Sequence, residues 1–224
     1  MHPGLKQSEG YRYMQEMLPA VKALWAGDYA HEGELWSFPT ATSVPKPLQQ
    51  PHPPVWIAAR APVTNDYAVK HNCNIMSWPI TRPMNEVETY LQRLETALEE
   101  NPGKARPTFS TMRHTCVYDS VDQWTVPVEA AIRQLGQFEN LFKNMGGVEN
   151  GFPAAIDLAS VANRDEYDRQ MLHDNLLFGT PDEVIQKLNQ YKDLGVDHFI
   201  YYASLGLGFK QQKQIGRASC RERV

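Results

Sequence analysis

The sequence predicts an α/β protein built around a parallel sheet, and two observations carry that prediction. Short apolar segments rich in β-branched and aromatic residues recur along the chain, and segments of helical periodicity stand between them. Strands that alternate with helices are joined by crossover connections, which favour parallel pairing. With 224 residues, of which 42% are hydrophobic, the chain is long enough for one sizeable core.

The first third of the chain is expected to hold a helix, an irregular segment and a strand. Residues 11–26 place apolar side chains at helical spacing, and Pro19 is expected to kink or restart this helix. Residues 28–54 contain six prolines and little periodicity, so we expect irregular structure with a short strand pair around Leu35. The stretch at 55–59 (VWIAA) is typical of a buried parallel strand.

The remaining elements continue the alternation of helix and strand. Asn85 is the expected cap of one helix, and Thr180 to Glu183 has the pattern of a capping box that starts another. We expect helices at 63–71, 85–101, 128–142 and 180–194, and strands at 74–78, 107–118 and 198–203.

The turn after the first strand has the character of a phosphate site. Pro62 suits the first position of the following helix, and Thr64 falls in its first turn. A helix N-terminus presents unpaired backbone N–H groups and the positive end of a dipole, and Arg60 adds a cation. Most such turns in α/β proteins bind nothing, so a purely structural turn stays open as an alternative.

Composition excludes several other classes of function. The net charge of −4 argues against a general nucleic-acid binder. No signal peptide or long apolar stretch points to a membrane. Cys73, Cys116 and Cys220 form no disulfide framework, so a reducing cytoplasm is expected, and no Cys/His cluster has zinc-ligand spacing, so no metal is expected.

Several separate motifs resemble the bacterial luciferase-like, flavin-dependent monooxygenase family. They occur in the family's order and spacing: HEGELW at 31–36, PHPPVWIAA at 51–59, FGTPDEV at 178–184 and LGVDHF at 194–199. The resemblance runs from about residue 8 to residue 214 and implies a (β/α)8 TIM barrel. The four expected strands match the second half of that barrel, so residues 1–214 are expected to be a truncated barrel domain, its C-terminal half.

The last ten residues, 215–224 (IGRASCRERV), resemble the translation of a common short-read sequencing adapter. We therefore expect them to be a sequencing artefact that is no part of the fold. An ordinary polar tail is the alternative.

The resemblance also implies a function. It implies an FMN-dependent monooxygenase in which reduced flavin, supplied by a separate reductase, and O2 are used to oxygenate a small organic substrate. The intact parent is expected to be a homodimer, and the fragment itself inactive. Two alternatives stay open: a deazaflavin-dependent oxidoreductase, and a non-catalytic luciferase-like partner subunit. The residues do not indicate which substrate is used.

By resemblance, the flavin phosphate lies at the turn after the fifth strand, which assigns this role to Ala59, Arg60, Ala61 and Thr64. Arg60 departs from the family's commoner small or acidic residue at its position. Trp78, at the end of the next strand, is expected either against the flavin or substrate, or in the core.

Two residues are candidates for the substrate pocket, namely His114 and Tyr201. A buried structural histidine is the alternative for His114. Tyr201 and Tyr202 point to opposite faces of the last strand, so at most one of them lines the barrel interior. The insertion at 146–178 is expected to be either a mobile flap or a surface decoration, and residues 163–168 within it are expected to form a solvated helix face.

Overall fold

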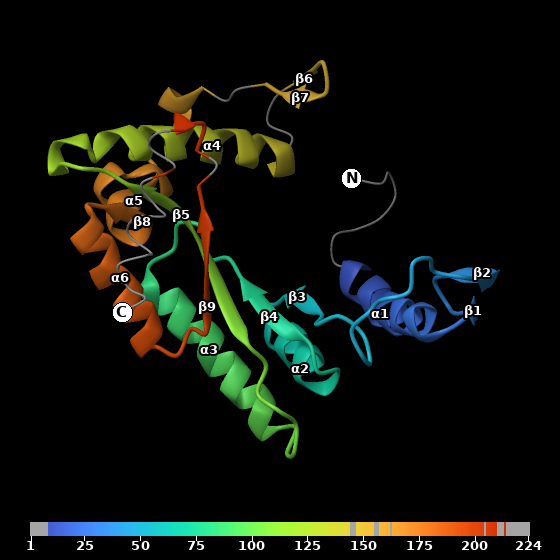
Figure 1. Cartoon of the computed structure of the whole chain (residues 1–224). Coiled ribbons are helices and arrows are strands. Elements are labelled where there is room, and N and C mark those ends of the chain that lie inside the picture. Colours follow the sequence, from blue (N-terminus) through green and yellow to red (C-terminus); the bar gives the residue numbers. More distant parts are fainter. Residues whose placement is uncertain are drawn as a thin grey trace. The chain divides into compact units, whose positions relative to one another are not determined.

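The computed structural model describes residues 9–143, 147–154, 157–161, 163–203, 205–209 and 213. The chain divides into two compact units, Met1–Trp56 and Ile57–Val224, which are described separately (Figure 1). The adapter-like residues 215–224 lie outside the described residues, so that expectation stays a prediction.

The first unit contains helix α1 (Gly10–Ala26) and the antiparallel pair β1 (Tyr29–Glu32) and β2 (Ser37–Ala41). The helix is continuous through Pro19, and the strand pair forms where one was expected. Glu16 of α1 holds the connection between the strands, because its carboxylate accepts hydrogen bonds from the backbone N–H groups of Leu35 (3.0 Å) and Trp36 (2.8 Å).

The second unit contains the predicted sheet. It is formed by β3 (Trp56–Ala58), β4 (Asn74–Ser77), β5 (Phe109–Val117), β8 (Leu177–Gly179) and β9 (His198–Tyr202). The order is β3-β4-β5-β8, and β9 also pairs with β5. Strands β4, β8 and β9 are all parallel to β5, which confirms the parallel α/β architecture.

Five helices accompany this sheet in the described residues: α2 (Pro62–Lys70), α3 (Met84–Glu99), α4 (Thr125–Lys143), α5 (Arg169–Asn175) and α6 (Pro181–Asp193). Helix α6 starts with the predicted capping box, in which the Thr180 N–H donates to the Glu183 carboxylate over 2.7 Å. Helix α3 corrects one expectation: its N-cap is Pro83, and Asn85 lies inside the first turn. None of the described helices is long and apolar enough to cross a bilayer.

The insertion after α4 contains a hairpin that the sequence did not predict, formed by β6 (Val148–Glu149) and β7 (Phe152–Pro153). The two short helical pieces that the sequence predicts after it are present as 3-10 turns at Leu158–Val161 and Asp165–Tyr167. A further 3-10 turn, Val121–Gln123, precedes α4.

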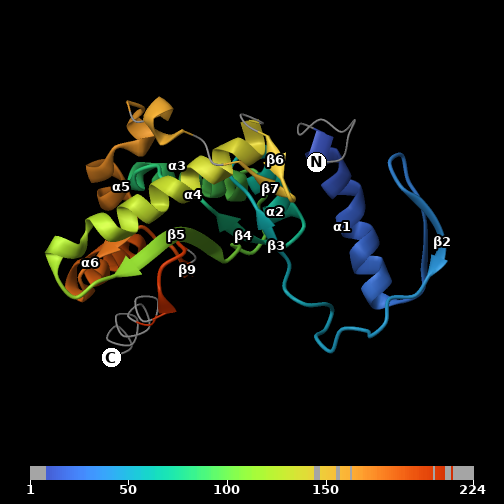
Figure 2. The same ribbon diagram turned by 90° about the horizontal axis from the view of Figure 1, so that it is seen from above.

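The two faces of the sheet have different surroundings. Val117 and Leu177 pack with Val184 and Leu188 of α6, so alternate residues of β5 face this helix. His114 and Tyr202 lie on the other face, where their rings stack 4.5 Å apart. Figures 1 and 2 show α3 and α6 beside the sheet, and α4 running across the carboxyl ends of β5 and β9.

A lysine on α6 ties three backbone segments together. The Lys187 ammonium donates to the carbonyls of His173 (2.7 Å), Leu176 (2.9 Å) and Phe178 (3.0 Å). These carbonyls belong to the end of α5 and the start of β8, where no helical N–H is in place to satisfy them. Lys187 therefore joins α5 and β8 to α6.

Replacing this lysine should destabilise the second unit. We expect Lys187→Met to lower the free energy of unfolding by about 2–3 kcal/mol, because buried carbonyls lose a charged donor while helix propensity is kept. Lys192→Met is the matched control, since Lys192 is an exposed lysine of the same helix. Urea unfolding of both variants measures the difference, and equal stabilities would contradict this role.

Candidate functional site

The turn after β3 has the backbone arrangement that the sequence predicts. Ala59 is fully buried, and its N–H continues the sheet by donating to the Met76 carbonyl over 3.2 Å. Ala61 is the N-cap of α2 in an extended conformation, and Pro62 occupies the first helical position. A strand therefore runs directly into a helix N-terminus here.

Several donors at this turn are used within it. The Ala61 carbonyl accepts from the backbone N–H groups of Thr64 (3.1 Å) and Asn65 (3.2 Å). It also accepts from the Thr64 hydroxyl (2.8 Å) and the Asn65 amide (2.9 Å). The Ala59 N–H and the Thr64 hydroxyl proton are thus directed to backbone carbonyls, and the Arg60 side chain is the exposed charged group at the turn.

A cavity of about 620 Å³ adjoins Arg60. Its walls come from the loop after β4, the start of α3, the middle of α4 and the segment before α5. The lining residues are Arg60, Pro79, Ile80, Thr81, Arg82, Pro83, Glu86, Tyr90, Leu135, Phe138, Glu139, Arg164, Asp165, Glu166, Tyr167 and Met171. The cavity lies beside the carboxyl ends of β3 and β4, which is where α/β proteins bind ligands.

One arginine of the cavity is neutralised by its neighbours. Arg164 pairs with Glu139 over 2.7 Å and with Glu166, and its guanidinium lies 5.4 Å from the centre of the Tyr167 ring. The Tyr167 hydroxyl donates to Glu139 over 2.7 Å, and burial together with this carboxylate raises the pKa of Tyr167. One guanidinium faces two carboxylates here, so this network is net negative.

Two other arginines leave more positive charge at the cavity. Burial and Glu86 raise the pKa of Tyr90, whereas Arg60, which hydrogen-bonds the same hydroxyl, opposes that rise. Arg82 is exposed, and its guanidinium forms no ion pair with any acidic side chain that the structure describes. Arg60 and Arg82 therefore bring positive charge to this side of the cavity, where the carboxylate of Glu86 also lines the wall.

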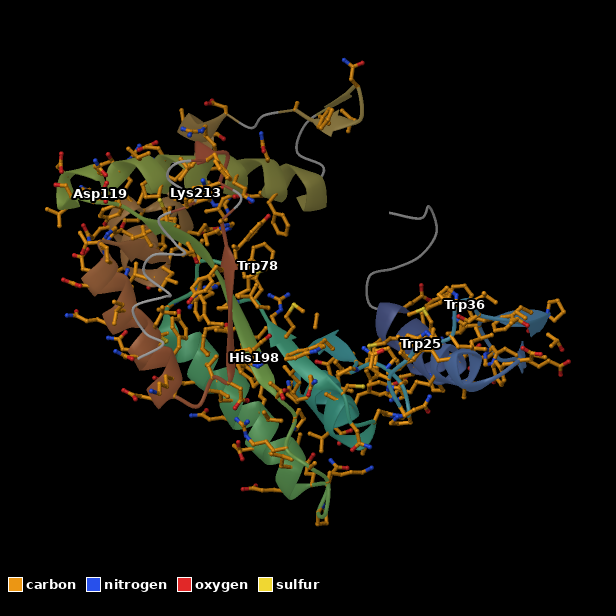
Figure 3. All side chains as sticks on the ribbon, viewed as in Figure 1. Trp25, Trp36, Trp78, Asp119, His198 and Lys213 are labelled. Atoms are coloured by element: carbon orange, nitrogen blue, oxygen red, sulfur yellow. The ribbon has the colours of Figure 1, made fainter. Side chains whose placement is uncertain are left out.

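An aromatic cluster lies next to the cavity on the face of the sheet that carries His114. The Trp78 ring centroid is 5.3 Å from that of Phe138, 5.9 Å from that of Tyr202 and 6.0 Å from that of His114. Phe138 belongs both to this cluster and to the cavity wall. Figure 3 shows Trp78 in the region below α4, far from His198 at the opposite end of β9.

The aromatic cluster contains polar atoms without a partner in the described part of the chain. Trp78 Nε1, His114 Nδ1 and Gln134 Oε1 are buried and form no hydrogen bond with a described residue, although the Gln134 amide nitrogen donates to the Tyr202 hydroxyl over 2.9 Å. Buried polar atoms are nearly always satisfied in native proteins. The Trp78 N–H can donate a hydrogen bond, and His114 Nδ1 and Gln134 Oε1 can accept one. These atoms are therefore suited to a flat ligand that is rich in heteroatoms.

Of the four residues assigned to the phosphate turn, Arg60 lines the cavity, whereas Ala59, Ala61 and Thr64 do not. Trp78 and His114 belong to the aromatic cluster. Tyr201 lies on the opposite face of β9, opposite Arg113 in the register and 5.4 Å from the Phe199 ring, so it is not brought beside His114. Tyr202 takes that place instead, because it pairs with His114.

Several residues of the site were not singled out from sequence. Phe138 lies within the helix expected at 128–142, and Gln134, Arg82 and Tyr90 carry no motif. Within the segment at 163–168, Asp165–Tyr167 form a 3-10 turn, and the other residues are exposed or half-buried, as expected of a solvated face. Tyr167 is the exception, because it is buried against Glu139. In the described part of the chain, no three His, Cys, Asp or Glu side chains are grouped as metal ligands would be.

Comparison with known proteins gives related sequences and structures. A profile of the family described as luciferase-like monooxygenase matches residues 2–198. The oxygenase component of the flavin-dependent trigonelline monooxygenase of Acinetobacter baylyi is 34% identical over 217 residues, which cover 95% of this chain and 59% of that protein. The chain thus spans about three fifths of the length of this relative.

Two solved structures share the fold. One is the oxygenating constituent of the 3,6-diketocamphane monooxygenase of Pseudomonas putida in complex with FMN, with a TM-score of 0.65, 17% identity, and coverage of 99% of this chain and 66% of that one. The other is an F420-dependent secondary alcohol dehydrogenase, with a TM-score of 0.69, 16% identity, and coverage of 97% and 64%.

The burial of His114 predicts a pH dependence of stability. Burial, with a smaller effect of the Arg113 charge, lowers the pKa of His114 from 6.5 to about 4. Below pH 6.5 the unfolded chain binds a proton that the folded chain does not, so the stability contribution present above pH 6.5 is lost as the pH falls toward 4. Between pH 7.5 and 4.5 this loss is about 2–3 kcal/mol.

Urea unfolding at both pH values tests this expectation. His114→Phe should lose less stability than the wild type over the same interval, by about the amount given above. The difference between the two proteins removes the contribution of all other titrating groups. An identical pH dependence of the two would refute the assignment, and NMR titration of the imidazole gives the folded-state value directly.

Proposed function

The chain belongs to the luciferase-like monooxygenase family, and we propose that the whole protein is an FMN-dependent monooxygenase that oxygenates a small organic substrate with O2. The sheet and its helices have the α/β, luciferase-like TIM-barrel fold of that family. The single observation that carries the proposal is the combination of Arg60 and Arg82 at one side of the cavity and an adjacent aromatic cluster with buried polar atoms that lack a described partner.

The residues present fit the two ends of FMN. An isoalloxazine ring is flat and carries hydrogen-bond donors and acceptors along its edge, which suits the aromatic cluster and its unpaired atoms on Trp78, His114 and Gln134. A phosphate suits the guanidinium groups of Arg60 and Arg82. Because the donors of Ala59 and Thr64 are directed to backbone carbonyls, the positive charge at the proposed phosphate site comes from these two guanidinium groups.

The chemistry is divided between cofactor and protein. Bound reduced flavin supplies the reactivity toward O2, and the protein supplies binding, orientation and exclusion of water. Trp78 and Phe138 would hold the ring by contact with its face or edge. The neutral imidazole of His114 would accept a hydrogen bond without adding charge, and Arg164 with Tyr167 would close the cavity wall against solvent.

A partner is part of the proposal. The relative from Acinetobacter baylyi is an oxygenase component, and a protein of that kind receives reduced flavin from a separate reductase. We propose the same for the whole protein that contains this chain, together with a homodimeric assembly. The assignment of β3, β4, β5 and β9 to the second half of the barrel stays a prediction.

Two alternatives remain distinguishable by experiment. The F420-dependent neighbour favours hydride transfer with a deazaflavin as the second candidate. A non-catalytic partner subunit is the third. Anaerobic titration with reduced FMN and with reduced F420 separates the first two, and O2 consumption that depends on added reductase separates an oxygenase from an inactive subunit.

The role of Arg60 can be tested with two flavins. Arg60→Ala should weaken the binding of FMN by about tenfold to a hundredfold, because a charge-assisted hydrogen bond is worth roughly 1.5–3 kcal/mol. Binding of riboflavin, which has no phosphate, should barely change. Both flavins are titrated in their reduced form under anaerobic conditions.

The matched control is Arg133→Ala, which removes an exposed arginine of α4 outside the cavity lining. It should leave both affinities as they are. If FMN and riboflavin weaken in parallel in Arg60→Ala, the arginine is structural and the proposed phosphate site is wrong.

A further inference from the structure

We propose that Arg113 is a positioning residue for the cavity: its buried guanidinium holds the loop at residues 79–83 in the conformation that forms the cavity wall. Arg113 does not line the cavity itself. The inference rests on the proposed function in one respect, namely that the cavity binds a flavin.

The guanidinium of Arg113 is fully buried and is bonded on several sides. Its Nε donates to the Tyr191 hydroxyl on α6 over 2.8 Å. Its Nη1 donates to the carbonyls of Ile80 (3.2 Å) and Arg82 (2.6 Å), and its Nη2 donates to the carbonyl of Pro83 (3.5 Å). Among the described residues, no carboxylate pairs with this cation.

Burying the Arg113 guanidinium has a free-energy cost that must be offset. Burying a charge without a counter-ion is unfavourable, and it is tolerated when hydrogen bonds satisfy the group. Three backbone carbonyls of one loop supply most of that satisfaction. Arg113 and this loop are therefore mutually dependent, since each leaves buried groups unpaired if the other moves.

The loop itself is in a conformation that needs support. Ile80 has a φ of +55°, which is a strained conformation for a β-branched residue. A second side chain holds the loop from another direction, because the Asn175 amide of α5 donates to the Thr81 carbonyl over 2.9 Å. The carbonyls of residues 80 to 83 are thus all held by side chains from β5 or α5.

The other side of the same loop is the cavity wall. Residues 79 to 83 all line the cavity, and Trp78 of the aromatic cluster directly precedes them. Arg113 is also the neighbour of His114 on β5, so adjacent residues of one strand anchor the loop on one face and join the cluster on the other. A change at Arg113 should therefore alter the cavity without removing any group that touches a ligand.

The first experiment is the variant Arg113→Lys, which keeps the charge but replaces the planar fork with a single ammonium group that cannot bond Tyr191 and the three carbonyls together. We expect amide hydrogen exchange in residues 79–86 to become about tenfold faster, measured without any flavin. We also expect the affinity for reduced FMN to fall by about tenfold, because the wall that positions the ligand is displaced.

Tyr191→Phe is the matched variant. It removes the hydrogen bond from Arg113 to α6 but leaves the three carbonyl contacts of the loop in place. We expect it to lower stability to urea without changing exchange in residues 79–86 or FMN affinity. A merely structural Arg113 would make both variants behave alike.

The outcomes separate the two proposals. If Arg113→Lys matches Tyr191→Phe in loop exchange, the positioning role is overturned. Failure of the wild type to bind FMN overturns the proposed function, while the exchange data still decide whether Arg113 holds the loop. Should Arg113→Lys not fold, Arg113→Gln tests the same contacts, because its amide can keep only part of the hydrogen bonds to the three carbonyls: faster exchange in residues 79–86 than in Tyr191→Phe supports the inference, and equal exchange contradicts it.

Discussion

The second unit depends on strand β5, whose nine residues pair with β4, β8 and β9. Because successive side chains of a strand point to opposite faces, β5 contributes residues to both sides of the sheet. Arg113 reaches α6 and the loop after β4, and Val117 packs against α6. His114, one residue along, stacks on Tyr202 beside Trp78. A slip of one residue would exchange these two sets, so the register of β5 decides both the packing of the helices and the composition of the site.

The composition of β5 is unusual for a strand buried in a parallel sheet. Such strands are ordinarily continuous apolar segments, whereas β5 carries Ser110, Thr111, Arg113, His114 and Thr115, all buried. The hydroxyls of Ser110 and Thr111 and the Nδ1 atom of His114 are buried without a hydrogen-bond partner among the described residues. A strand optimised for stability alone would not retain these groups. His114 belongs to the proposed ligand site, where such a local conflict with folding rules is expected of a functional element, whereas Ser110 pairs with His198 at the other end of β9.

Much of this fold could be predicted from sequence, because hydrophobic periodicity and helix caps are local signals. The strands at residues 55–59 and 198–203 and the capping box at Thr180 are of this kind. The site was harder to predict. Assigning Tyr202 rather than Tyr201 to the face of His114 needed the pairing register between β5 and β9, and no local pattern contains it. Arg82, Gln134 and Phe138 join the site only through tertiary contacts between a loop and α4. The proposed role of Arg113 depends on its burial. Charged side chains are rarely buried, so the sequence alone favours an exposed arginine at this position.

The turn at Ala61 shows how a correct local prediction can lead to a different electrostatic arrangement. A strand does enter a helix N-terminus there, but the Ala61 carbonyl collects the donors of Thr64 and Asn65. Proline at the first helical position has no N–H to offer. Charge for an anion must then come from the side chains of Arg60 and Arg82, whose exposure makes their attraction weaker and more sensitive to salt than that of buried backbone dipoles. Anion binding at this edge of the sheet therefore requires that both guanidinium groups lie at the same cavity. Arg82 belongs to the loop that Arg113 holds in place.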